Sequence, residues 1–192
     1  MHDPAADSDP LTMYDAVLEF WFDEASRRSW FEASADFDAL VSQRLAALYR
    51  IGVEGRLDPW KTHSDGALAL CILLDQVPRN IFRGSARAFA TDAQARAVAR
   101  HILASGFDRS YPTDGHRLFC YLPFEHSEDI EDQRLAVQLL SERTADRHST
   151  DYARGHLEII ARFGRFPHRN AILGRISTAA ELEFLKGPGA SF

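Results

Sequence analysis

The hydrophobic pattern is helical along the chain, and its most apolar stretch lies near the middle. Every residue from Ala67 to Leu74 is apolar, and the character then changes abruptly at Asp75, Gln76 and Pro78. A helix that is apolar on all faces is typical of the centre of a domain, where other helices surround it. Because proline does not continue a helix, we predict that this central helix ends at Pro78 and that Asp75 occupies its last turn.

Other segments show apolar residues at helical spacing, or the capping patterns that begin a helix. They span residues 12–22, 36–52, 91–105, 114–123, 127–140, 151–164 and 178–186, on either side of the central helix. No segment stands out with the period of two that a half-buried strand requires. The pattern therefore predicts an all-α fold of about eight helices. We expect residues 12–186 to form one domain, between a flexible lead at 1–11 and a flexible tail at 187–192.

Charge and composition exclude several classes of protein. The formal net charge of −6 disfavours a generic nucleic-acid-binding protein. No apolar run approaches the roughly 18 residues needed to span a bilayer, and the N-terminus lacks the segments of a signal peptide. Cys71 and Cys120 lie in apolar runs and fit buried, reduced thiols. We expect a soluble, cytoplasmic protein with no cofactor and no nucleic-acid or membrane partner, and the oligomeric state stays open.

Two short segments of the chain are similar to each other. PRNIFRG at 78–84 and HRNAILG at 168–174 both carry Arg-Asn, then apolar residues and glycine, and both follow an apolar helix. Hairpin ends in a helical stack fall on shared edges. We therefore expect these two Arg-Asn turns to border one cavity, with Asp75 paired to Arg79.

Longer motifs resemble a known family. They are LLDQVPRNIFRG with ARAFATD, YLPFEHSED, and RFGRFPHRNAILGR with a following Ser-Thr, together with an early Trp-Phe pair and the segment that contains Gly55, Leu57, Pro59 and Trp60. These motifs resemble a bacterial family catalogued as domain of unknown function nine-two-four, over nearly the whole chain. The resemblance implies a tetratricopeptide-like, right-handed stack of antiparallel helical hairpins, and it implies no activity.

Polar side chains gather at three of the predicted helix ends. The candidates for ligand binding are Asp75, Gln76, Arg79, Asn80, Arg83, Arg162, Arg165, His168, Arg169 and Asn170, and the candidates for acid–base catalysis are His126, Glu128 and His156. Asp75 and Glu128 would neutralise two of the arginines and leave spare positive charge. Because arginine binds carboxylates and phosphates bidentately, the leading hypothesis is an Arg-lined concave site for a small anionic molecule or an acidic peptide group.

Other functions stay open. An enzyme would use His126, Glu128 and His156 on a phosphorylated or carboxylated substrate, and a deep cavity with perturbed pKa values would favour it over a shallow binding groove. Alternatively, the polar groups only satisfy helix-end carbonyls and each other. A metal site built from His126, Glu128, His156 and His168 is less favoured, because no established metal-ligand spacing is present.

Overall fold

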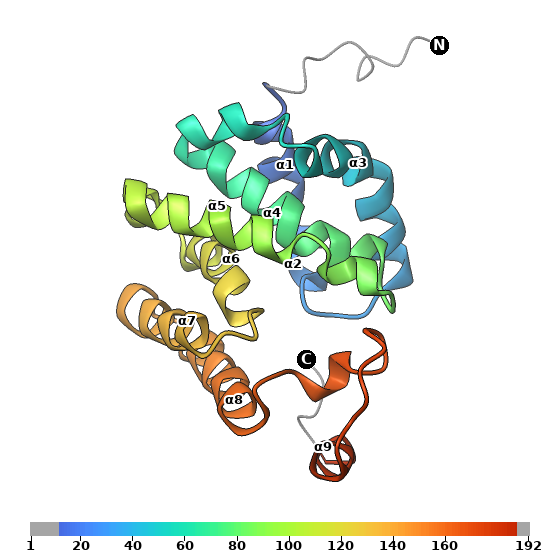
Figure 1. Ribbon diagram of the computed structural model, residues 1–192. Helices are drawn as coiled ribbons and strands as arrows, with labels where there is room; N and C mark the ends of the chain where they lie inside the picture. Colours follow the sequence, from blue (N-terminus) through green and yellow to red (C-terminus); the bar gives the residue numbers. More distant parts are fainter. Residues whose placement is uncertain (1–11, 188–192) are drawn as a thin grey trace.

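The computed structural model describes residues 12–187. In this part of the chain the regular secondary structure is all helical, without a strand, and it includes nine α-helices. They are α1 (Tyr14–Trp21), α2 (Glu24–Ser29), α3 (Ala35–Val53), α4 (Ser64–Ile81), α5 (Asp92–Ser105), α6 (Asp114–Glu125), α7 (Ile130–Arg143), α8 (Arg147–Phe163) and α9 (Ala179–Phe184). The all-α class is confirmed, and the stacked helices are compatible with the tetratricopeptide-like description (Figure 1).

The central helix is α4, as the apolar run predicts. It packs against α1, α3, α5 and α6 (Figure 1). Every residue from Gly66 to Pro78 is buried. At Gly66 an added Cβ would lie 2.4 Å from the Trp60 carbonyl oxygen, so this close approach requires glycine. Burial of apolar surface from all sides makes α4 the centre of the core.

The predicted end of α4 at Pro78 is wrong, because the helix continues to Ile81. Proline removes one N–H, so the carbonyl four residues earlier, that of Leu74, loses its donor. The Thr91 hydroxyl donates to this carbonyl at 2.6 Å. A tertiary contact therefore replaces the missing bond, and Asp75 lies inside the helix rather than in its last turn.

The same correction applies to α6, which passes through Pro123 and ends at Glu125. Here the carbonyl without a helical donor is that of Phe119. The Cys71 thiol donates to it, with Sγ and the oxygen 3.4 Å apart. In both proline-containing helices, a side chain from another segment thus replaces the missing donor.

Other boundaries shift by a few residues. The short helix α2 was not predicted, and it follows an N-cap at Asp23. α8 begins at Arg147, earlier than expected, because Asp146 caps it. α7 begins after Asp129 instead of at 127. The lead at 1–11 and the tail at 187–192 lie outside the described residues, except for Gly187. Among the described helices, none has both the length and the apolar character needed to cross a membrane.

The segment after α8 brings the two Arg-Asn turns together. It runs back toward the connection between α4 and α5 before α9 begins (Figure 1). The Arg169 guanidinium lies 4.6 Å from the centre of the Phe89 ring, and Arg169 Nη1 lies 3.6 Å from Asp92 Oδ2. These contacts join the C-terminal turn to the chain that follows α4.

Candidate functional site

The two Arg-Asn turns border one cavity of about 410 Å³. It lies between the C-terminal end of α4, the helices α6 and α8, and the segment after α8. Arg79 and Arg83 from the first turn line it together with Arg169 from the second. This volume is within the range of small-molecule sites. The expected juxtaposition of the two turns is therefore present.

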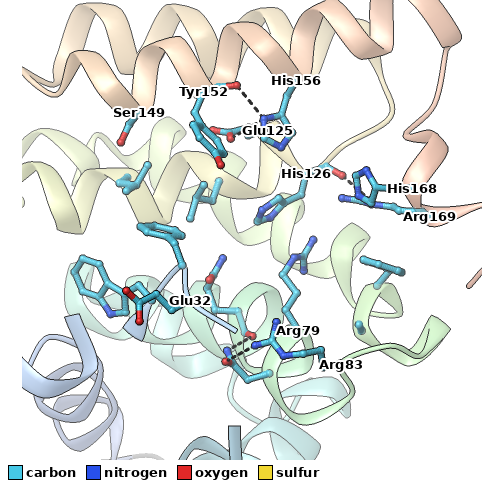
Figure 2. A pocket seen from close by; sticks show the side chains of 18 of the residues that line it. Glu32, Arg79, Arg83, Glu125, His126, Ser149, Tyr152, His156, His168 and Arg169 are labelled. Atoms are coloured by element: carbon cyan, nitrogen blue, oxygen red, sulfur yellow. Dashed lines mark hydrogen bonds and ion pairs between the residues drawn. The ribbon is translucent and has the colours of Figure 1, made fainter. Parts of the chain in front are cut away.

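Most of the candidate residues reach this cavity. Its lining includes Gln76, Arg79, Asn80, Arg83, His126, His156, His168 and Arg169, whereas Asp75, Glu128, Arg162, Arg165 and Asn170 do not line it. Figure 2 shows Glu125, Tyr152 and His156 on one side, Arg79 and Arg83 on the other, and His126 between them.

Two arginines share one carboxylate at the cationic end of the cavity. Arg79 Nη1 lies 2.9 Å from Asp92 Oδ1 and 3.4 Å from Asp75 Oδ1. Arg169 approaches the other oxygen of Asp92, and both guanidiniums lie over the ring of Phe89. The predicted pairing of Asp75 with Arg79 is confirmed. Asp92, at the start of α5, was not predicted and is the nearer partner.

The charge balance differs from the expected one. Glu128 pairs with Arg175 instead of a cavity arginine, and Arg83 forms a bidentate pair with Asp38 at 2.6 and 2.7 Å. Asp38, Asp75 and Asp92 therefore offset arginine charge, but they do not line the cavity. Arg79, Arg83 and Arg169 line the cavity at this end, and the acids that line it are Glu32 and Glu125.

Arg79 and Arg169 keep their charge in this buried setting. Arg79 Nη2 is buried and has no hydrogen-bond partner among residues 12–187. Burial and the charge of Arg79 lower the pKa of Arg169 to about 10, which still leaves a cation at neutral pH. An unpartnered buried guanidinium nitrogen is costly.

His126, the C-cap residue of α6, is held in one orientation by Asp75. Nδ1 lies 2.9 Å from Asp75 Oδ1. Burial opposes ionisation of Asp75, but the Arg79 charge and the His126 contact outweigh it and lower the pKa of that carboxyl. Burial and Arg79 lower the pKa of His126 as well. The neutral ring therefore donates from Nδ1 to the carboxylate, which leaves Nε2 unprotonated, with a lone pair that can accept a proton.

Glu125 is a buried acid that the sequence analysis missed. Glu125 lines the cavity with a side chain that is 4% exposed, and its Oε1 lies 3.1 Å from His156 Nδ1. Burial, together with the nearby Asp75, raises the pKa of Glu125 to about 8. Burial also lowers the pKa of His156 to about 3, so both groups are neutral at pH 7. The sequence feature that could have indicated Glu125 is its position directly after the apolar run 118–124.

Comparison with known proteins identifies the family. Residues 17–189 match a family described as "Bacterial protein of unknown function (DUF924)". The chain belongs to this family. It is also similar to the solved structure of ATU0120, a protein of unknown function from Agrobacterium tumefaciens, with 37% identity, a TM-score of 0.88, and alignment of 93% of this chain with 100% of that one. No curated protein matches the chain.

Four of the candidate site residues of this DUF924 protein make their contacts outside the cavity. Glu128 accepts from Arg175 at 2.7 and 2.9 Å, and also from the backbone N–H of Phe166. The others bind within the C-terminal segment: Arg165 pairs with Glu181, Asn170 donates to Ser177, and Arg162 lies over Phe163 and Phe184. The Glu128 and Arg162 contacts fasten this segment to the chain before α7 and to α8, and the Arg165 and Asn170 contacts hold the segment together. We assign none of the four a part in the cavity.

The metal arrangement considered from the sequence does not form. Within residues 12–187, no cluster of three or more His, Cys, Asp or Glu side chains is placed to hold a metal ion. Glu128 is held by Arg175, away from the cavity that contains His126, His156 and His168. Three histidines that line the cavity, His126, His156 and His168, have lowered pKa values, mainly because they are buried.

Proposed function

We propose that this cavity binds a small organic anion, whose carboxylate or phosphate pairs with Arg79 and Arg169. The observation that carries the proposal is the convergence of these two arginines on one cavity, with Arg79 Nη2 buried and unpartnered among the described residues. A guanidinium recognises such groups by paired N–H donors. The acids that pair with the cavity arginines, Asp38, Asp75 and Asp92, do not line the cavity, whereas Glu32 and Glu125 do.

The remaining wall indicates an apolar portion of the ligand. Trp30, Phe31, Leu118 and Leu122 line the same cavity. An anion with an aromatic or aliphatic body would bury apolar surface there, at about 25 cal/mol per Å². The cavity volume favours a whole small molecule over an extended acidic peptide, which was the other partner expected from the sequence.

The cytoplasmic location of the protein also stays a prediction.

The proposal is tested by thermal shift with succinate, phosphate, benzoate and hexanoate, each against chloride at matched ionic strength. A ligand that binds only the native state stabilises it by RT ln(1 + [L]/Kd). We expect at least one anion to raise the Tm of the wild-type protein. The Arg169→Lys variant keeps the charge but loses the bidentate donor geometry, so the shift should fall sharply.

The matched control is Arg165→Lys. Arg165 follows α8 like Arg169, but it pairs with Glu181 and does not line the cavity. This variant should retain the full anion-dependent shift. If no anion raises the Tm above chloride, or if both variants lose the shift equally, the cavity is not the binding site.

A further inference from the structure

The same cavity holds two ionisable groups arranged for proton transfer beside its cationic end. We infer that it is a hydrolytic active site, in which His126 acts as a general base on water and the Glu125 carboxyl donates to the carbonyl oxygen of a carboxylate-bearing ester or amide. This inference rests on the proposed function, because Arg79 and Arg169 would hold the carboxylate of that substrate.

The geometry around His126 is that of an oriented base. Asp75 is fully buried and accepts from His126 Nδ1 at 2.9 Å. Gln76 Nε2 also donates to Asp75, at 2.6 Å, and Arg79 lies 3.4 Å from it. A carboxylate fixed in this way sets the tautomer of the imidazole and stabilises the imidazolium that forms when Nε2 takes a proton. Arg169 Nη1 donates to the His126 carbonyl at 3.0 Å, which fixes the backbone as well.

Glu125 supplies the complementary donor. Because it precedes His126 in the chain, the two side chains leave α6 at the same end, and both line the cavity (Figure 2). Its carboxyl stays protonated at neutral pH because burial disfavours the charge. A neutral carboxyl in an apolar wall donates a hydrogen bond to a developing oxyanion.

The reaction balances with water as the only co-reactant. A water O–H bond breaks as the proton moves to His126 Nε2, and the water oxygen bonds to the carbonyl carbon. The carbonyl electron pair moves onto its oxygen, which accepts a hydrogen bond from Glu125. When the intermediate collapses, the bond to the leaving oxygen or nitrogen breaks, and the leaving group takes the proton from His126. An acid and an alcohol or amine are released, and both residues regain their starting state.

Water, not a side chain, is the nucleophile in this scheme. Ser149 lines the cavity at the start of α8, but its hydroxyl donates to Asp146 at 2.6 Å as part of the helix cap. Cys71 and Cys120 are fully buried, and neither lines the cavity.

The experiment follows release of 4-nitrophenolate from mono-(4-nitrophenyl) succinate, with 4-nitrophenyl acetate as the uncharged comparison. We expect the wild-type protein to hydrolyse the anionic ester faster than the uncharged one. His126→Gln should lower kcat roughly 100-fold or more, which is the usual range for a general base. The control is His63→Gln, because His63 precedes α4 and does not line the cavity; its rate should match that of the wild type.

The pH profile distinguishes catalysis from a structural role. The groups that face His126 are Asp75, Arg79, Asp92, His156, His168 and Arg169, and those that face Glu125 are Asp75 and His156. Activity should rise with pH through the pKa of His126, which lies below 6.5, because the base must be neutral. It should fall near pH 8, where Glu125 loses its proton. Glu125→Gln keeps a donor that does not titrate, so the alkaline fall should disappear.

Several outcomes would overturn the inference. One is hydrolysis that His126→Gln leaves unchanged. Another is NMR of the native wild-type protein that finds the proton of neutral His126 on Nε2, a measurement that does not depend on the folding of a variant. If succinate raises the Tm but neither ester is hydrolysed in a His126-dependent way, the proposed binding stands and the hydrolytic role fails. If none of the four anions raises the Tm above chloride and no ester is hydrolysed, both fail.

Discussion

At the scale of single residues, Asp75 connects the core to the cavity. Its side chain is fully buried, where an isolated carboxylate would be costly. Contacts with Arg79, His126 and Gln76 compensate for that cost. Removing one partner of a buried ion pair lowers the free energy of unfolding by more than the net contribution of the pair, because the remaining charge stays buried without compensation.

Arg79→Ala should therefore lower the free energy of unfolding by about 3–5 kcal/mol. The measurement is urea denaturation, in a double-mutant cycle with Asp75→Asn. The control is Arg154→Ala, whose pair with Asp151 is exposed and should contribute less than about 1 kcal/mol. Additive effects of Arg79→Ala and Asp75→Asn would show that the two residues do not stabilise each other.

At the scale of helices, α4 and α6 both continue through a proline. In each, the carbonyl that lacks its helical donor accepts from a side chain of another segment: Thr91 for α4 and Cys71 for α6. A buried carbonyl without a donor costs about 1–3 kcal/mol. Because α4 continues beyond Pro78, Arg79 and Asn80 lie at the cavity. The contact of Thr91 with the Leu74 carbonyl therefore helps to position the site.

Thr91→Val should lower the free energy of unfolding by about 1–3 kcal/mol, because the shape is kept and the Leu74 carbonyl loses its donor. Urea denaturation measures the change. Thr144→Val is the matched control: the Thr144 hydroxyl also donates to a carbonyl, that of Leu140, but this carbonyl already accepts from a backbone N–H. Equal losses in the two variants would contradict the role of Thr91 at the proline.

At the scale of the whole molecule, the cavity forms where distant parts of the chain meet. Its lining comes from residues 30–32, 76–89, 118–126, 148–156 and 168–172. The same packing completely buries Cys71 of α4 and Cys120 of α6. Burial raises the pKa of both thiols, so the reactive thiolate is suppressed in the native state.

Labelling of Cys71 and Cys120 by a thiol reagent should therefore require unfolding of the core. We expect native labelling to be slow, and to accelerate with urea in parallel with the loss of helical signal. An added thiol at the exposed position Ser141, in Ser141→Cys, should react rapidly without urea and serves as the control. Rapid labelling of either native cysteine in the folded wild-type protein would show that the core opens locally.

The sequence by itself determined the all-α class, the central helix and the candidate turns, because periodicity and capping act over a few residues. The capping box at Thr178 and Glu181 is one example. Only the tertiary structure decided that α4 passes through Pro78, since the donor to the Leu74 carbonyl comes from Thr91, in another segment. It also decided that Glu125 lines the cavity while Glu128, three residues later, binds Arg175. The reason is that burial and charge partners depend on segments far apart in the chain, whose relative placement no local pattern records.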